Sequence, residues 1–315
     1  MEFSEKTVSS KTNYHLAGII PVAGLPLDYE MPYPDCLLPV GPDYTMIEAA
    51  IVEAAFAGCD TIWIVCNDDI SPLIRYRVGD FIEDPVYFYN NFSPRPSQNR
   101  KRIPIFWVPV HPKDRDRRDC LSWSVIHGAV SCLKVSSNLS KWLIPDKYYV
   151  SFPYGIFDPR PLQKIRKKIK TQDNFYVSSA GKTVQDDLYA SFTFGKDEFI
   201  KYRKNIRKGT GMYMSNPDDI NAIPTERLPV EERWSARYFS LSQVFTDLDL
   251  NQSTIYSAPD FSNLDSWQSY REYMNTDLSK DIQRPTRKLF SYREFNSIAK
   301  IELKRRILWK SKNIA

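Results

Sequence analysis

The sequence predicts an α/β fold, a mixed and mostly parallel sheet flanked by helices, and three observations support this prediction. Apolar runs of strand length alternate with segments of helical periodicity, a pattern typical of parallel sheets covered on both faces. The first 66 residues contain a complete strand–helix–strand unit, whose crossover is right-handed in almost all proteins. Its second strand, residues 61–66, is continuously apolar, as expected of a strand buried on both sides.

Local signals mark the elements of this first unit. The apolar run 16–22 predicts the first strand. The helix that follows begins at a capping box, in which Thr45 and Glu48 each accept a bond from the other's backbone N–H. Gly58 is placed to end this helix in the left-handed conformation. The helix is expected to direct one apolar side inward, formed by Met46, Ile47, Ala50, Ile51, Ala54 and Ala55.

The alternation of strands and helices continues to about residue 275. Strands are predicted at 103–110, 147–152, 175–177 and 189–194, and helices at 121–135, 161–170, 196–206, 231–245 and 266–274. We therefore divide the chain into an N-terminal arm, one α/β domain and a basic amphipathic tail, at residues 1–15, 16–283 and 284–315.

Composition excludes several classes of protein. The sequence has no run of eighteen apolar residues, so no membrane-spanning helix is predicted. Residues 1–13 are too polar for a signal peptide. The five cysteines form no C-x-x-C pair, which indicates reduced, buried thiols and a cytoplasmic protein. With three histidines and no cysteine pair, a zinc site is not expected.

The net charge of +5 is unevenly distributed, because residues 284–312 alone carry +8 and the remainder carries −3. A basic tail indicates a nucleic acid or an acidic protein partner. The alternative is a solvated basic helix that docks on the body through an apolar stripe of Phe290, Phe295, Ile298, Ile301 and Leu308. The arm has few apolar residues of its own. Both ends therefore predict a homo-oligomer or a larger protein assembly.

Several motifs lie where strands are predicted to end, which is where open α/β sheets bind ligands. The loop 21–24, followed by the sequence L-L-P-V at 37–40, resembles the opening of the sugar-phosphate nucleotidyltransferases. Residues 120–124, 151–157 and 263–270 resemble later motifs of that family. The resemblance covers about residues 16–275 and implies the nucleotide-diphospho-sugar transferase (GT-A) fold. It is the resemblance of a divergent member, of the kind encoded by tailed phages of marine cyanobacteria.

The resemblance implies a nucleotide or nucleotide-sugar site, with substrate-binding positions at Ala23, Gly24, Trp123 and Tyr154. Family members join a nucleoside triphosphate to a sugar phosphate, using cations around the phosphates and two aspartates that hold Mg²⁺. The positions implied for those aspartates carry Tyr154 and Asn263, and the position implied for a lysine carries Asp35. Carboxylates in place of cations repel phosphates. We assign no catalytic residue and no metal ligand.

A rebuilt phosphate site is the alternative. Four cations precede the predicted helix at 121, and helix amides together with arginine forks bind phosphate: Lys113, Arg115, Arg117 and Arg118. The same loop is equally consistent with solvated, internally paired charges. Two functions stay open. The first is a degenerate transferase that serves as a binding or assembly component, such as one of a phage particle, located in the host cytoplasm or the virion. The second is an active, Mg²⁺-dependent nucleotidyltransferase with a rebuilt site.

Two weaker motifs have structural alternatives. The sequence Asn67-Asp68-Asp69 after the second strand supplies metal-ligand chemistry, but such residues are common turn formers. His127 follows Cys120 by seven residues, two helical turns, which is too far for a catalytic pair within one helix. We interpret His127 as a packed helix residue.

Overall fold

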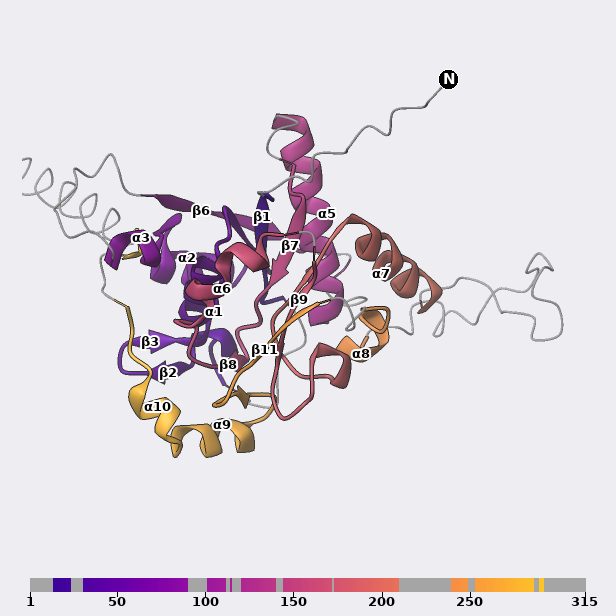
Figure 1. Ribbon diagram of the computed structural model, residues 1–315. Helices are drawn as coiled ribbons and strands as arrows, with labels where there is room; N and C mark the ends of the chain where they lie inside the picture. The colour runs from indigo at the N-terminus through magenta and orange to yellow at the C-terminus, as the bar shows by residue number, and fades with distance from the viewer. Residues whose placement is uncertain are drawn as a thin grey trace, which may run out of the picture.

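The computed structural model describes residues 14–23, 31–89, 101–111, 114, 120–139, 144–171, 173–209, 239–248, 253–285 and 289–291. Within these residues the largest sheet has eight strands in the order β11-β9-β10-β7-β1-β4-β6-β5 (Figure 1). The prediction of a mixed, mostly parallel sheet flanked by helices is confirmed.

Four strands in the middle of the sheet are parallel: β1 (Leu16–Pro21), β4 (Thr61–Cys66), β6 (Arg102–Pro109) and β7 (Lys147–Val150). The strand β5 (Phe81–Glu83) pairs antiparallel with β6 at one edge, and β10 (Phe192–Phe194) pairs antiparallel with both β7 and β9 (Phe175–Ser178). The other edge is β11 (Thr254–Ser257), parallel to β9. Two small ladders lie outside this sheet, β2 (Pro39–Gly41) with β3 (Tyr44–Thr45), and β8 (Gly155–Ile156) with β12 (Ser262–Asn263).

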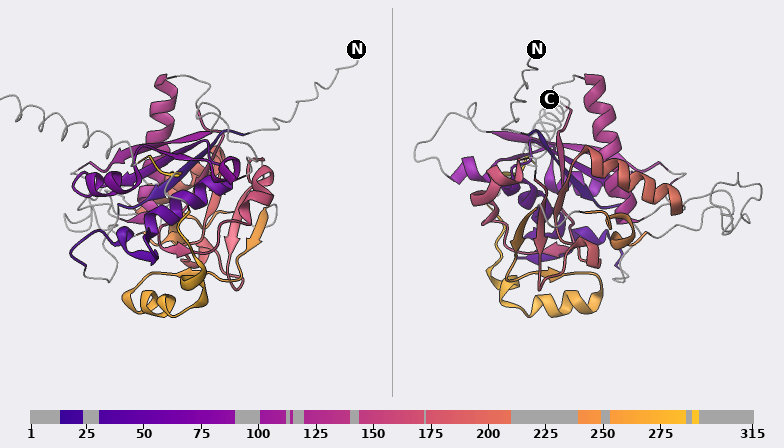
Figure 2. Two further views of the ribbon diagram at one scale, coloured as in Figure 1. Left: turned by 90° about the vertical axis from the view of Figure 1, so that its left-hand side faces the viewer. Right: turned by 45° about the vertical axis from the view of Figure 1, so that its right-hand side comes forward.

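Helices cover both faces of the sheet (Figures 1 and 2). One core includes residues of α1 (Met46–Ala57), α2 (Ser71–Val78), α6 (Leu162–Ile169) and α9 (Trp267–Met274). The other includes residues of α5 (Leu121–Leu139), α7 (Lys196–Gly209) and α8 (Leu241–Val244). The described residues also form two short helices, α3 (Pro85–Tyr89) and α10 (Asp277–Asp281).

Alternate residues of β1 serve the two cores. Leu16 and Ile20 belong to the core under α1, whereas Ala17 and Ile19 belong to the core under α5. This is the period of two that a strand dictates. Helix α5 lies unusually close to the sheet, because a Cβ atom at Gly128 would lie 2.7 Å from a methyl group of Val65. Glycine is therefore required where α5 crosses β4.

Helix α1 confirms its predicted ends. The capping box of Thr45 and Glu48 is present, and Gly58 ends the helix with a φ of 97°. The expected one-sided burial is wrong, since eleven of its twelve residues are buried. Helix α1 packs against α6 and α3 and also against the β2–β3 ladder, so it has no solvent face of the usual kind.

Other boundaries differ from the predictions. The strand predicted at 189–194 begins only at Phe192, and the Tyr189 N–H bonds the Asn263 side chain instead of a neighbouring strand of the sheet. Of the helix predicted at 231–245, residues before 239 lie outside the described residues, and only 241–244 are helical. The elements α2, α3, β5, α10 and β11 were not predicted. In the part of the chain that the structure describes, no helix is long and apolar enough to span a bilayer.

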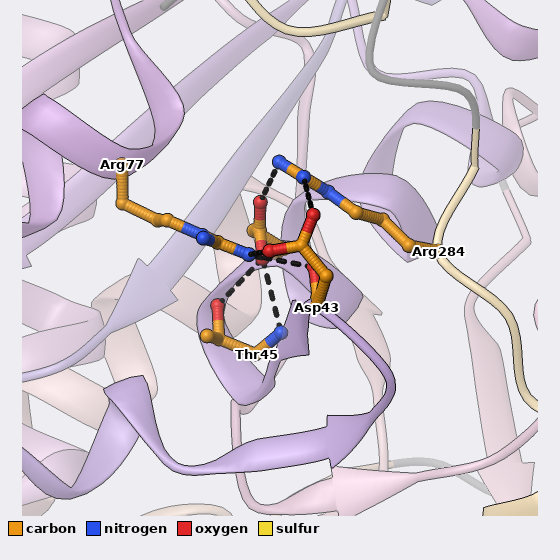
Figure 3. Close-up of polar contacts among 5 residues, drawn as sticks. Asp43, Thr45, Arg77 and Arg284 are labelled. Carbon is orange, nitrogen blue, oxygen red and sulfur yellow. Dashed lines mark hydrogen bonds and ion pairs between the residues drawn. The ribbon is translucent and has the colours of Figure 1, made fainter.

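After α10 the chain returns across the body as a segment that we term the C-terminal strap, residues 282–285 and 289–291. The side chain of Arg284 is only 8% exposed, and its guanidinium bonds Asp43 at 2.7 Å and Glu48 at 2.5 Å (Figure 3). Leu289 and Phe290 are buried, and Phe290 forms a bridge with Ile82 of β5. The start of the predicted basic tail thus packs on its own body. Residues from 292 onward lie outside the described residues.

Candidate functional site

The predicted site lies where β1, β4 and β7 end. The Val22 and Ala23 N–H groups both donate to the Val65 carbonyl oxygen at 2.8 Å, which fixes the chain leaving β1. The Ser124 hydroxyl at the start of α5 donates to the Ala23 carbonyl. The structure therefore brings Ala23 beside the turn of α5 that carries Trp123. Gly24, the next predicted site residue, lies outside the described residues.

Trp123 is placed at this edge of the sheet but is largely enclosed. It is 7% exposed, and its ring stacks on His127 at a centroid distance of 4.7 Å and an angle of 9°. His127 Nε2 lies 3.2 Å from the Pro109 carbonyl oxygen, and burial lowers the pKa of His127. Since one face of the indole is already covered, Trp123 fills space here as a packed side chain. The interpretation of His127 as a packed helix residue is confirmed.

Tyr154 and Asn263 are neighbours in space, although 109 residues separate them. Asn263 of β12 pairs with Gly155 of β8, and the Leu264 N–H donates to the Tyr154 carbonyl at 2.7 Å. Tyr154 is 5% exposed, and its ring centroid lies 5.6 Å from that of Tyr189.

The close approach of these segments requires Gly155. A Cβ atom at this position would lie 2.0 Å from the Tyr189 carbonyl oxygen. The short ladder of β8 and β12 is therefore held tightly against residues 189–190.

These side chains do not fit a divalent cation. The side-chain Oδ1 of Asn263 accepts a hydrogen bond from the Tyr189 N–H at 2.9 Å. The side-chain Nδ2 of Asn263 donates to the Asp265 carboxylate at 3.3 Å. Mg²⁺ prefers carboxylate and water oxygens in octahedral geometry, and this pair supplies a phenol and an amide already engaged. Among the described residues, no three His, Cys, Asp or Glu side chains are grouped to hold a metal.

Acidic residues occur in the segments that follow β1 and β4 in the chain. Asp35 begins a short 3₁₀ helix (Asp35–Leu37) and is buried, at 9% exposed. After β4, residues 68–70 form a turn in which the Asp69 carboxylate accepts the Ile70 N–H at 3.0 Å. The turn-forming interpretation of Asn67-Asp68-Asp69 is the one the geometry supports.

The described residues do not include the four cations of the predicted phosphate loop, Lys113, Arg115, Arg117 and Arg118. Within this loop the structure describes Asp114, whose N–H donates to the His111 carbonyl at 2.7 Å. The phosphate-binding role of the loop stays a prediction.

Sequence reasoning missed a buried carboxyl group beneath this edge. Glu53 of α1 is 4% exposed and accepts hydrogen bonds from the hydroxyls of Tyr149 (2.6 Å), Ser151 (2.9 Å) and Ser191. Burial raises the pKa of Glu53 to about 7, although the three hydroxyl bonds oppose that change. The sequence did contain a sign of this buried carboxyl group, because Glu53 is flanked by apolar residues in a predicted helix that has no polar face.

A buried lysine lies at the opposite, amino end of β7. The Lys147 ammonium donates to the backbone carbonyls of Ile169 (3.3 Å), Thr171 (3.2 Å) and Asp173. Burial lowers the pKa of Lys147 to about 8. Because Ile169 is the last residue of α6, the ammonium satisfies carbonyls at a helix C-terminus and has a structural role.

Comparisons with known proteins show the fold. No protein-family model and no protein of curated function matches the sequence. A structure described as a glucose-1-phosphate thymidylyltransferase from Bacillus anthracis, in complex with a sucrose, aligns with a TM-score of 0.50 at 11% identity. That alignment covers 86% of this chain and 98% of the other.

Two other solved structures align less closely. A UDP-glucose pyrophosphorylase complexed with UDP-glucose gives a TM-score of 0.45 at 12% identity, covering 82% of this chain and 97% of the other. Rv0371c from Mycobacterium tuberculosis gives 0.45 at 11% identity, covering 84% and 100%. The alignment at a TM-score of 0.50 shows that the eight-stranded sheet and its flanking helices match the nucleotide-diphospho-sugar transferase-like fold that the motifs predict.

Proposed function

We propose that this chain is a nucleotidyltransferase-like protein that has lost metal-dependent transfer and serves as a binding component of a protein assembly. The observation that carries the proposal is the pair Tyr154 and Asn263. Both lie where the resemblance implies two metal-holding carboxylates, and both are committed to packing or hydrogen bonds. A site of this fold without those carboxylates lacks the groups that would position a metal for phosphoryl chemistry.

The electrostatics of the described edge support the same proposal. Asp35 replaces a cation, and a unit charge about 4 Å away contributes on the order of 4 kcal/mol at an effective dielectric near 20. A triphosphate therefore meets repulsion from Asp35 where the family supplies attraction. We expect any nucleotide or nucleotide-sugar that binds to take its attraction from the cations at 113–118.

An assembly role is supported by the end of α5, which extends beyond the sheet (Figures 1 and 2). Its last turns expose Leu133, Val135 and Leu139, the last of these at 67%. Val135 and Leu139 are four residues apart and lie on one side of this protruding helix, and exposed apolar side chains paired in this way favour a protein contact. Membership of a phage particle and nucleic-acid binding by the tail stay predictions.

The proposal is tested by thermal-shift titration of the full chain with nucleoside triphosphates and nucleotide sugars, with and without Mg²⁺. Ligands that bind only the native state raise the melting temperature. We expect no shift that depends on Mg²⁺ and no release of pyrophosphate. The matched control is the triple variant Arg115→Gln, Arg117→Gln, Arg118→Gln. A Mg²⁺-dependent shift in the native chain that this variant abolishes would establish the rebuilt transferase instead.

The assembly role is tested by light scattering of the full chain and of a Val135→Ser, Leu139→Ser variant. We expect self-association or co-purification with a protein partner that the variant weakens. A chain that stays monomeric and captures no partner that the variant loses would contradict it.

A further inference from the structure

Helix α2 exposes two large apolar side chains side by side. Leu73 is 54% exposed and Tyr76 is 70% exposed. Three residues separate them, so they lie on the same face of the helix. The opposite face is buried through Ile74 and Val78. The exposed pair is therefore an apolar surface on the outer side of a helix that packs on the body through its other side.

The cations of α2 are already paired and do not screen this surface. Arg75 bonds Asp80 at 2.7 Å, and Arg77 bonds Asp43 and Glu48 at 3.0 Å. The acidic residues Asp68 and Asp69, both exposed, stand just before the helix begins. The face thus consists of an apolar pair with carboxylates beyond its N-terminal end.

The described part of the C-terminal strap ends beside this helix. The Ser291 hydroxyl accepts hydrogen bonds from the N–H groups of Asp80 (2.7 Å) and Phe81 (3.2 Å), and the Ser291 N–H donates to the Phe81 carbonyl. Asp80 is two residues past the end of α2. Residue 292 therefore continues from a point one helical turn away from Tyr76.

The sequence that follows Ser291 repeats the spacing of the exposed pair. Phe295 and Ile298 are three residues apart, as Tyr76 and Leu73 are. Four residues span at most about 14 Å, which brings Phe295 within reach of Tyr76. A helical segment running antiparallel to α2 would then place Ile298 near Leu73, one turn further on.

The charges of the two segments also favour an antiparallel arrangement. Lys300 and Lys304 follow Ile298, and a helical path of about 13 Å from Ser291 brings Lys300 to the N-terminal end of α2. That end carries Asp68 and Asp69. Opposite charges thus meet in the same register that pairs the apolar side chains.

We propose that the segment after Ser291 docks on α2 of its own chain, with Phe295 against Tyr76, Ile298 against Leu73, and Lys300 beside Asp69. This occupant is favoured over a second copy because the chain is already anchored at Ser291, which gives the segment a high effective concentration at α2. The inference is independent of the proposed function. It uses the apolar stripe of the tail within the chain and leaves the opposite, basic side outward.

Cysteine cross-linking of the full chain tests the register. The five native cysteines are buried, so the two introduced cysteines are the ones expected to react. We expect the Tyr76→Cys, Phe295→Cys variant to form a disulfide within one chain under mild oxidation, identified by peptide mapping. The matched control is Arg75→Cys, Phe295→Cys, with the same reach but a different face of α2. Its yield should be about tenfold lower.

Equal yields at positions 75 and 76 would overturn the proposal. A 76–295 disulfide that migrates as a dimer on a non-reducing gel would also overturn it, and would assign α2 to a second copy. The variants Leu73→Ser and Ile298→Ser give a second readout. We expect each to lower Tm and the double variant to lower it no further than the more harmful single change. Additive losses would show that the two side chains do not meet.

Discussion

Helix α1 carries two buried glutamates only five residues apart, and the fold compensates them in opposite ways. Glu48, in the first turn and 0% exposed, bonds the guanidinium groups of Arg77 and Arg284 (Figure 3). Glu53, 4% exposed, has no cation within bonding distance among the described residues and accepts only hydroxyl hydrogen bonds.

The difference follows from where each side chain lies. Glu48 is at the rim of the fold, where α2 and the C-terminal strap bring long cationic side chains from solvent. Glu53 faces the sheet beneath β7, where an arginine would leave its own charge unpaired. Hydroxyls from Tyr149, Ser151 and Ser191 satisfy the carboxyl group without adding charge, and its pKa rises to about 7. The three predictions below test this contrast, in order of expected effect.

We expect the ion pairs of Glu48 to make the largest contribution to the free energy of unfolding. The Arg284→Met variant removes a guanidinium that is 8% exposed and leaves Glu48 with Arg77 alone. Breaking a buried pair by removing one partner typically costs about 3 kcal/mol or more, and we expect a loss near 3 kcal/mol in the free energy of unfolding, measured by urea denaturation. The control Lys280→Met breaks the exposed pair with Asp277 and should change nothing measurable. A loss at Arg284 as small as the control's would refute the contrast.

Compensation by hydroxyls alone makes stability depend on pH. The folded pKa of Glu53 lies above its unfolded value of 4.5, so the native state keeps the proton longer than the unfolded chain does. Its contribution is therefore complete below about pH 4.5 and is lost as pH rises through about 7, by about 3 kcal/mol. Urea denaturation between pH 4.5 and 7.5 should show this decline in the native chain relative to Glu53→Gln. Parallel curves for the two proteins would contradict it.

The smallest effect concerns the hydroxyl donor at Glu48. The Thr45 hydroxyl bonds the Glu48 carboxylate at 2.9 Å, beside the backbone N–H bond of 3.0 Å. Replacing Thr45 by Ala removes one donor and a favourable helix-capping residue, and should cost about 1 kcal/mol. Thr45→Ser keeps the hydroxyl and should retain most of the stability. An equal loss in both variants would assign the effect to the methyl group instead.

The ends of α1 were predictable from the sequence because they depend on neighbours in the chain. Thr45, Glu48 and Gly58 act within one or two turns, and the strands around them follow from local apolar runs. The partners of Glu48 were not predictable, since Arg77 and Arg284 are 29 and 236 residues away. No local pattern specifies such contacts.

The candidate site shows the same limit. The resemblance implied one site for positions 154 and 263, and the structure pairs the segments that carry them. The sequence also showed that neither position carries a carboxylate. It did not reveal that Trp123 stacks on His127 or that Asn263 bonds the Tyr189 N–H, since both depend on side-chain packing between distant segments.

The C-terminal strap has a consequence for the order of events during synthesis. The carboxylate of Glu48 leaves the ribosome long before Arg284, whose bond to it spans 236 residues. At translation rates of about 5–20 residues per second, the interval is on the order of 10–50 s. Through that interval the first turn of α1 has at most one of its two arginines. A nascent chain ending before residue 284 should therefore open at this corner first, exposing β5 and the start of α1 to chaperones and proteases.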